Sequence, residues 1–373
     1  MGYEAKVISR ISGSLRDAPF ASPLHTAAAA ADQFLVKDPS FEAPISLYRD
    51  RLSQQLADAL KDVDVIHLHW PHGLINLDAL GEIAGGRPVI WTLHDMAAFT
   101  GVCHYSLGCE RFTSGCESCP AVRSPFHGAV RQRLTDKAAA IEGIDDLRIV
   151  TPSHWLAGEA ARSSVLAGRS IRVIPNPLAL PPETDVRREG QGHLSGLPDS
   201  GSDPGEPERV RLLVLAANLE DPLKGVADAV DGFHRAFPDG QGATLQLVGR
   251  GHLGDGTPGV VSLGYQPASE VSTLLQMADY LIVASRAENQ PLAIAEAQAK
   301  GVSIIGRNAA GIPEHLEIDP EGALFDSVES LADSLAALTP RSPLHREQLA
   351  RRARLHFDPL KAAKAYEEVY LGS

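Results

Sequence analysis

Apolar residues along the chain occur in short runs that alternate with stretches of helical spacing. In the first half, five short β-branched or leucine-rich runs predict strands. These runs lie at 6–8, 63–68, 88–93, 148–151 and 171–174. Helices are predicted at 51–60, from the spacing of its apolar residues, and at 153–165, where Ser153 can cap the first turn. This alternation is typical of a mostly parallel sheet with helices on both faces.

A second alternation of the same kind begins at Arg211. Its predicted strands lie at 212–215, 244–248, 260–263, 280–284 and 303–305. Its predicted helices lie at 224–237, 268–277, 291–300 and 328–337, with two more between 344 and 371. We therefore predict an α/β protein of two doubly wound Rossmann-like domains, whose ligands bind at the carboxyl ends of the strands.

The two halves are separated by a stretch of different composition. Residues 181–208 are rich in Gly, Pro, Ser, Asp and Glu and nearly lack apolar residues, which predicts a flexible linker or insertion. We divide the chain into an N-terminal domain, a linker, a C-terminal domain and a C-terminal helix that we expect to pack back on the N-terminal domain. These parts span 1–178, 179–209, 210–355 and 356–373.

Charge and hydropathy exclude several classes of protein. The 34 basic and 47 acidic side chains give a net charge of −13, whereas a surface that follows nucleic acid needs clustered Lys and Arg. No apolar run approaches the ~20 residues of a membrane helix, and the first residues lack the pattern of a signal peptide. We expect a cytoplasmic protein that does not bind nucleic acid.

Four basic residues after the cysteines leave one membrane hypothesis open. They are Arg123, Arg131, Arg133 and Lys137. A basic helix face of this kind can bind peripherally to the inner membrane face, but a solvated helix is the simpler interpretation.

All four cysteines fall within one loop, residues 101–120. They are Cys103, Cys109, Cys116 and Cys119, with the spacing C-x5-C-x6-C-x2-C. Four thiolates so close in sequence suit a tetrahedral structural Zn²⁺. Two disulfides or free buried thiols are the alternative. A closed site of four protein ligands would stabilise the loop and take no part in catalysis.

The segment from Ser285 to Ala297 follows a predicted strand and opens a predicted helix. Pro291 suits the first helical turn, and a helix N-terminus offers amides to an anion. A carboxylate at Glu296 can accept two hydrogen bonds from a vicinal diol such as ribose. Taken singly, a capping carboxylate at Glu288 and a solvated one at Glu296 are the simpler interpretations.

Together, several motifs resemble the signature of the family-4 (group 1) retaining glycosyltransferases, which have the GT-B fold. The matching motifs are Lys224-Gly225, Glu288-x7-Glu296, Ala299-Lys300-Gly301 and Ala310-Gly311-Ile312-Pro313-Glu314. In the first domain, Trp91 to Met96 followed by Thr100-Gly101-x-Cys103-His104-Tyr105 resembles a bacterial polysaccharide-type subgroup that carries the same cysteine cluster. The resemblance runs from about Val63 to the C-terminus.

The resemblance implies transfer of a sugar, with retention, from a nucleotide-diphosphate sugar to a glycan, lipid-linked or small-molecule acceptor. It implies no catalytic metal, in agreement with the lack of an Asp-x-Asp motif near the donor site. It also implies that Lys224 contacts the donor diphosphate, Glu288 the transferred sugar and Glu296 the ribose. The phosphates would lie against the backbone of Asn289, Gln290, Pro291 and Leu292.

The same resemblance implies that His94, at the end of a first-domain strand, faces the reacting centre from the acceptor side. The alternative is an ordinary hydrogen-bonded histidine at a strand end. A weaker assignment to the cleft applies to three more histidines at a strand end. They are His67, His69 and His72.

Two features depart from the family pattern. Members normally carry an Arg at the end of the strand before the lysine, where this chain has Asn218 or a neighbour, and Arg250 is the candidate to replace that charge. The strand at 6–8 resembles the second strand of the family, so we expect the chain to lack the family's first strand, its glycine loop and its helix. Both departures leave a second hypothesis open, a catalytically impaired accessory protein that binds nucleotide sugars.

Overall fold

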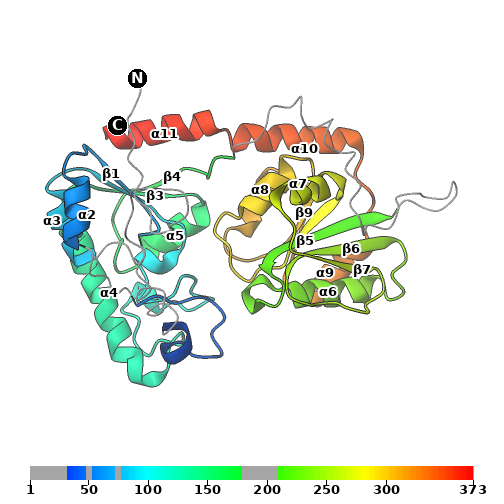
Figure 1. Ribbon diagram of the computed structural model, residues 1–373, viewed down its shortest axis with the longest axis horizontal. Coiled ribbons are helices and arrows are strands. Elements are labelled where there is room, and N and C mark those ends of the chain that lie inside the picture. Colours follow the sequence, from blue (N-terminus) through cyan, green and yellow to red (C-terminus); the bar gives the residue numbers. More distant parts are fainter. Residues whose placement is uncertain (1–31, 48–52, 72–76, 179–208, 373) are drawn as a thin grey trace. The chain divides into compact units, whose positions relative to one another are not determined.

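The computed structural model describes residues 32–47, 53–71, 77–178 and 209–372. The chain forms two compact units, each with its own parallel sheet. Unit 1 comprises Met1–Ile174 together with Tyr366–Ser373, and unit 2 comprises Pro175–Ala365 (Figure 1). Our predictions for the strand at 6–8 and for the missing first strand, and nearly all of the predicted linker, lie outside the described residues.

Unit 1 is built on four parallel strands in the order β1-β2-β3-β4. The strands are β1 (Ile66–His69), β2 (Val89–Thr92), β3 (Leu147–Thr151) and β4 (Ile171–Val173), which confirms the four predicted strands that lie in this region. All four residues of β2 are buried, as expected for a strand whose sheet is covered on both faces. The helices are α2 (Ser53–Leu60), α3 (Leu80–Ala84), α4 (His127–Glu142) and α5 (His154–Arg162).

Unit 2 contains six parallel strands in the order β10-β9-β8-β5-β6-β7. They are β5 (Val210–Asn218), β6 (Ala243–Arg250), β7 (Val260–Gly264), β8 (Tyr280–Val283), β9 (Ser303–Arg307) and β10 (Ala323–Phe325). The chain proceeds outward from β5 to β7 and then returns to the other side of β5 with β8. This is the strand order of the doubly wound dinucleotide-binding fold. The order therefore reverses between β5 and β8.

Helices cover both faces of the unit 2 sheet. They are α6 (Val226–Ala236), α7 (Ala268–Met277), α8 (Leu292–Gln298), α9 (Val328–Ala336) and α10 (Pro343–His356). A last helix, α11 (Pro359–Leu371), begins in unit 2 and ends in unit 1. Alternate residues of β5 point to opposite faces: Leu212 packs in one core with Phe233 and Leu331, and Leu213 packs in another with Leu274. The apolar run of β5 follows from this burial on both faces.

Lys137 on α4 is buried, with 3% of its surface exposed. Its Nζ donates to the carbonyl oxygens of Ala97 and Thr100, both at 2.7 Å, and of Gly101 at 3.3 Å. The prediction that Lys137 contributes to an exposed basic face is therefore wrong, because three carbonyls replace the water that this ammonium group loses.

Across the described ranges, we find no helix with both the length and the hydropathy to cross a membrane.

Candidate functional site

The loop between β5 and α6 in unit 2 is shaped by one glycine. Gly225 has φ +60°, and a Cβ added there would lie 2.2 Å from the carbonyl oxygen of Ala284. A side chain at this position would therefore clash with the backbone that follows β8. The glycine lets Lys224, the last residue of a short 3₁₀ turn, lie against the end of β8.

Lys224 and Glu288 form an ion pair although 64 residues separate them in the sequence. Lys224 Nζ lies 2.5 Å from Glu288 Oε1, and their side chains are 31% and 17% exposed. Lys224 follows β5 and Glu288 follows β8, the two neighbouring strands between which the strand order reverses. Doubly wound sheets bind ligands at the carboxyl ends of the strands at this switch point. The structure thus brings two predicted site residues together where the fold predicts a ligand.

The loop that carries Glu288 packs against the backbone of Gly311. The amide of Gly311 donates to the Glu288 carbonyl at 2.8 Å, and an added Cβ would lie 1.7 Å from the carbonyl oxygen of Asn289. Asn289 is 5% exposed, and the side-chain oxygen of Gln290 accepts from the amide of Asn176 at 2.5 Å. The motif glycine is therefore required because the two loops touch backbone to backbone.

Pro291 and Leu292 lie at the start of α8, and Leu292 is 49% exposed. Glu296 lies farther along this helix and is half-buried. Burial raises the pKa of its carboxyl above the ordinary value, and the charge of Lys300 opposes that shift. This helix confirms the element predicted at 291–300, with bounds one or two residues shorter.

Arg250 ends β6 and pairs in register with Asn218 at the end of β5. Its guanidinium carbon lies 5.2 Å from the centre of the Tyr265 ring. Arg250 therefore lies at the carboxyl edge of the sheet, on the strand next to β5. Its role as a replacement for the family arginine stays a prediction.

Arg286 is a basic residue beside the same loop that sequence analysis did not identify. Its amide donates to the carbonyl of Leu223 at 2.8 Å, which places it next to the Lys224 turn. Its guanidinium lies 3.6 Å from Asp228, which also pairs with Arg307 at 2.5 Å. Its position in the Ser285–Ala297 motif is the feature of the sequence that could have pointed to Arg286.

In unit 1, His94 belongs to a network that reaches the C-terminal helix. His94 Nε2 lies 2.9 Å from His69 Nδ1, and the ring of His69 lies 4.1 Å from that of His67. Both ring nitrogens of His67 are hydrogen-bonded at 2.8 Å, one to Thr92 Oγ1 and the other to the hydroxyl of Tyr370. The structure therefore joins three of the four predicted histidines, and His72 lies outside the described residues.

Burial keeps these imidazoles neutral. It lowers the pKa of His67 to about 3, with a further contribution from the neighbouring His69 and His94. Burial also lowers the pKa of His94, although Asp95 opposes this shift. At neutral pH, His94 is therefore a neutral hydrogen-bonding group rather than a cation.

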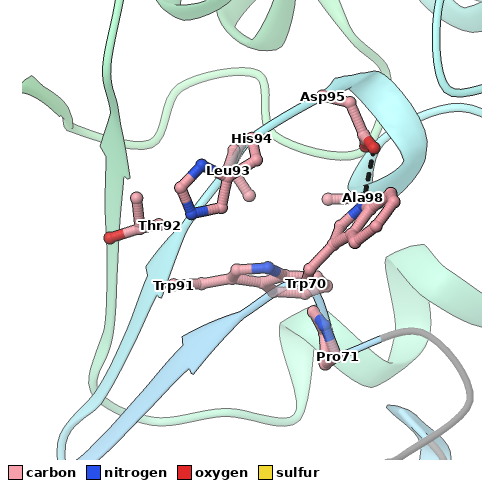
Figure 2. A pocket seen from close by; sticks show the side chains of 8 residues that line it. All are labelled: Trp70, Pro71, Trp91, Thr92, Leu93, His94, Asp95 and Ala98. Carbon is pink, nitrogen blue, oxygen red and sulfur yellow. Dashed lines mark hydrogen bonds between the residues drawn. The ribbon is translucent and has the colours of Figure 1, made fainter. Parts of the chain in front are cut away.

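A small pocket lies at the carboxyl end of β2. Figure 2 shows the side chains that line it, which are Trp70, Pro71, Trp91, Thr92, Leu93, His94, Asp95 and Ala98. Asp95 is buried and organises one side: it accepts from the amide of Ala97 at 2.8 Å and from the indole of Trp70 at 2.7 Å. Its second oxygen also lies 2.6 Å from Nδ1 of His104.

Sequence analysis identified only His94 among the pocket residues. Two signals for the others were available. Asp95 follows His94 directly, and Trp70 follows the strand-end histidine His69. The sequence does not show that the side chains of Trp70 and Asp95 bind each other.

The four cysteines are free thiols, so the zinc prediction is not supported. In the part of the chain that the structure describes, which includes all four, no three His, Cys, Asp or Glu side chains form a group that could hold a metal ion. Burial, with a further contribution from the neighbouring cysteines, raises the pKa of Cys103 to about 12 and that of Cys119 to about 11. Of the alternatives, the structure contains the free thiols.

Comparison with known families and proteins identifies relatives of both units. Residues 1–180 match the model of Glycosyltransferase Family 4, and residues 210–340 match that of Glycosyl transferases group 1. The chain is 27% identical over 269 residues to a putative colanic acid biosynthesis glycosyl transferase, WcaC, of Escherichia coli; the match covers 68% of this chain and 62% of that protein. It is 29% identical over 183 residues to N-acetyl-alpha-D-glucosaminyl L-malate synthase of Bacillus anthracis, covering 44% and 46%. The chain thus spans less than two thirds of either relative.

Solved structures share the fold at lower identity. Sucrose-phosphate synthase from Thermosynechococcus elongatus has a TM-score of 0.57 at 17% identity, covering 87% of this chain and 80% of that one. HepE of Anabaena, in complex with UDP, has a TM-score of 0.60 at 16% identity, covering 86% and 82%. With the two parallel-sheet units and the two family matches, these likenesses establish that the chain belongs to the family-4 (group 1) glycosyltransferases and has their GT-B fold.

Proposed function

We propose that this protein is a retaining glycosyltransferase that moves a sugar from a nucleotide-diphosphate sugar to a glycan, lipid-linked or small-molecule acceptor. The observation that carries the proposal is the Lys224–Glu288 pair at the switch point of the unit 2 sheet. A cation and a carboxylate at this position fit the two ends of such a donor, its diphosphate and its sugar hydroxyls.

Lys224 and Glu288 exchange partners when the donor binds, in this proposal. The Lys224 ammonium moves from the carboxylate to the diphosphate, and Glu288 then accepts hydrogen bonds from the transferred sugar. The backbone of Asn289 to Leu292 and the Glu296 carboxylate complete the contacts to phosphate and ribose. Positive charge at the diphosphate stabilises the leaving group as the anomeric carbon becomes oxocarbenium-like.

His94, which the family resemblance assigns to the acceptor side, acts in this proposal as a neutral hydrogen-bond donor to the sugar. Its low pKa supports this role, since a neutral imidazole does not repel a positively charged transition state. UDP is the nucleotide to test first, because HepE, which shares this fold, is solved with UDP and with UDP-glucose. The name of the Escherichia coli relative makes a growing polysaccharide the first acceptor class to test.

Donor turnover tests the proposal. Purified protein is screened with UDP-sugars by calorimetry for UDP binding and by mass spectrometry for UDP release. We expect Glu288→Ala to lower turnover by about a hundredfold or more with a small change in UDP affinity, and Lys224→Met to weaken UDP binding as well. Glu347→Ala, an exposed carboxylate on α10, is the matched control.

Three outcomes contradict the proposal at different points. Unchanged turnover in Glu288→Ala would remove the assigned role of this carboxylate. UDP binding without turnover of any donor in the wild type would favour the accessory-protein hypothesis. A product whose anomeric configuration, read by NMR, is inverted relative to the donor would exclude retention.

A further inference from the structure

Trp70 is the exposed member of the three tryptophans. Its surface is 58% exposed, whereas Trp91 is 2% exposed and Trp155 is partly buried. It follows the last residue of β1 and lines the pocket that also contains His94 (Figure 2). A large aromatic ring exposed at a pocket that also carries a few polar side chains is a feature of ligand sites.

The backbone of Trp70 is held in an unfavourable conformation. Its φ is +47°, in the left-handed region that bulky residues rarely adopt. Such strain persists only where the surrounding structure imposes it, and it is concentrated at functional sites. A glycine would adopt this φ without cost, whereas a tryptophan adopts it at the expense of backbone strain.

A chain of hydrogen bonds fixes the indole. Trp70 Nε1 donates to Asp95, and Asp95 contacts Nδ1 of His104, whose Nε2 lies 2.8 Å from the hydroxyl of Ser46. The His104 ring meets the indole edge to face, with centroids 5.7 Å apart and planes at 81°. The ring is thus held at one edge by buried partners, while more than half of its surface reaches solvent.

The chemistry around the ring matches one class of ligand. A pyranose ring has an apolar face of C–H groups, which an electron-rich aromatic face attracts, and a rim of hydroxyls that need polar partners. His94 lines the same pocket as the indole and carries an imidazole that can bond a hydroxyl.

We propose that Trp70 is a stacking platform for a pyranose ring of the acceptor saccharide, with its orientation set by the Asp95–His104–Ser46 chain. The inference rests on the proposed function in taking the saccharide to be the acceptor. It adds a specific residue and a ligand class to unit 1. Phe34, which is 76% exposed in the same unit but does not line the pocket, serves as the control.

Saturation-transfer NMR with methyl β-D-glucopyranoside and methyl β-D-galactopyranoside tests the platform. Irradiating the aromatic protons of the wild type should transfer saturation to the C–H protons on one face of at least one glycoside. Trp70→Gly, which relieves the backbone strain, should lower that signal about threefold to tenfold, in the range of one aromatic stacking contact. Trp70→Phe, which keeps an aromatic face but loses the bond to Asp95, should give an intermediate signal, and Phe34→Ala should retain most of it.

UDP binding, measured on the same samples, separates this inference from the proposed function. Normal UDP affinity together with an unchanged saccharide signal in Trp70→Gly overturns the platform and leaves the transferase proposal intact. No saccharide signal in a wild type that binds UDP also overturns the platform. An equal loss in Trp70→Gly and Phe34→Ala indicates a general structural effect and overturns it as well. A signal that depends on Trp70 in a protein that binds no nucleotide supports the platform and contradicts the donor assignment.

Discussion

At the scale of single residues, buried polar groups carry much of the organisation of unit 1. Asp95 is 6% exposed and contacts an amide, an indole and an imidazole. Burying a carboxylate is costly unless such partners compensate for lost water. The sequence marks this aspartate only as the residue after His94, and its partners at Trp70 and His104 become visible only in the folded chain.

We expect Asp95→Ala to lower the free energy of unfolding by about 3 kcal/mol, because three buried donors lose their acceptor. Urea unfolding followed by circular dichroism measures this change. Asp62→Ala, at an exposed position of unit 1, should change stability by less than about 0.5 kcal/mol. A loss below about 1 kcal/mol in Asp95→Ala would show that the partners find other acceptors.

His315 in unit 2 predicts a dependence of stability on pH. It is 3% exposed, and burial, aided by the charge of His356, lowers its pKa from 6.5 to about 3. The unfolded chain therefore binds a proton below pH 6.5 that the folded chain does not bind until about pH 3. The free energy of unfolding should therefore decrease as the pH is lowered through this window, by up to about 1.4 kcal/mol per pH unit.

His315→Gln, which removes the titrating group, isolates this contribution. The difference in unfolding free energy between wild type and variant should shift against the wild type between pH 6.5 and 4.5. Above pH 7 the difference should be constant. A difference that is flat from pH 7 to 4.5 would contradict the burial-lowered pKa.

At the scale of elements, the hydrophobic pattern predicted nine of the ten strands in the described ranges. The strand that it missed, β10, spans three residues, too few for a periodicity. Helix α4 was not assigned as an element, because its apolar stripe is interrupted by the buried Lys137. Both elements are stabilised by tertiary contacts that their local sequence does not show. Strand β10 pairs with β9, and Lys137 of α4 bonds three backbone carbonyls.

The β5–α6 loop depends on the close approach at Gly225. We expect Gly225→Ala to weaken UDP binding by about tenfold or more, since the added Cβ must displace the backbone after β8 and with it the Lys224–Glu288 pair. Gly256→Ala is the matched control: φ there is +81°, and no atom lies within 4 Å of the added Cβ. Calorimetric titration with UDP compares the two. Equal affinities would mean that backbone contact at Ala284 does not shape the site.

At the scale of the whole molecule, the chain ends in the unit where it began. Helix α11 starts in unit 2, and its last residues belong to unit 1. There, Arg148 donates to the carbonyls of Val369 and Tyr370, and Tyr366 bonds Thr92 at 2.9 Å. The C-terminal residues thus support the strands that carry the predicted histidines.

We expect the double variant Tyr366→Phe, Tyr370→Phe to lower the stability of unit 1 by about 2 kcal/mol, about 1 kcal/mol for each lost hydrogen bond. Hydrogen exchange should become faster in β1 and β2 and stay unchanged in β5 and β8, which serve as the internal reference. UDP affinity should be retained. Faster exchange in both units would contradict a contribution confined to unit 1.

The sequence by itself determined the α/β class, the alternation of the elements and the family, and it predicted the donor-side residues. It could do so because buried parallel strands leave continuous apolar runs and because Glu288, Glu296, Gly311 and Lys224 lie within recognisable local patterns. Only the tertiary structure decided which distant groups meet: Lys224 with Glu288, Trp70 with Asp95, and His67 with Tyr370. It also decided that Lys137 is buried and that the cysteines are free thiols, because burial and partner geometry depend on the whole fold and not on spacing along the chain.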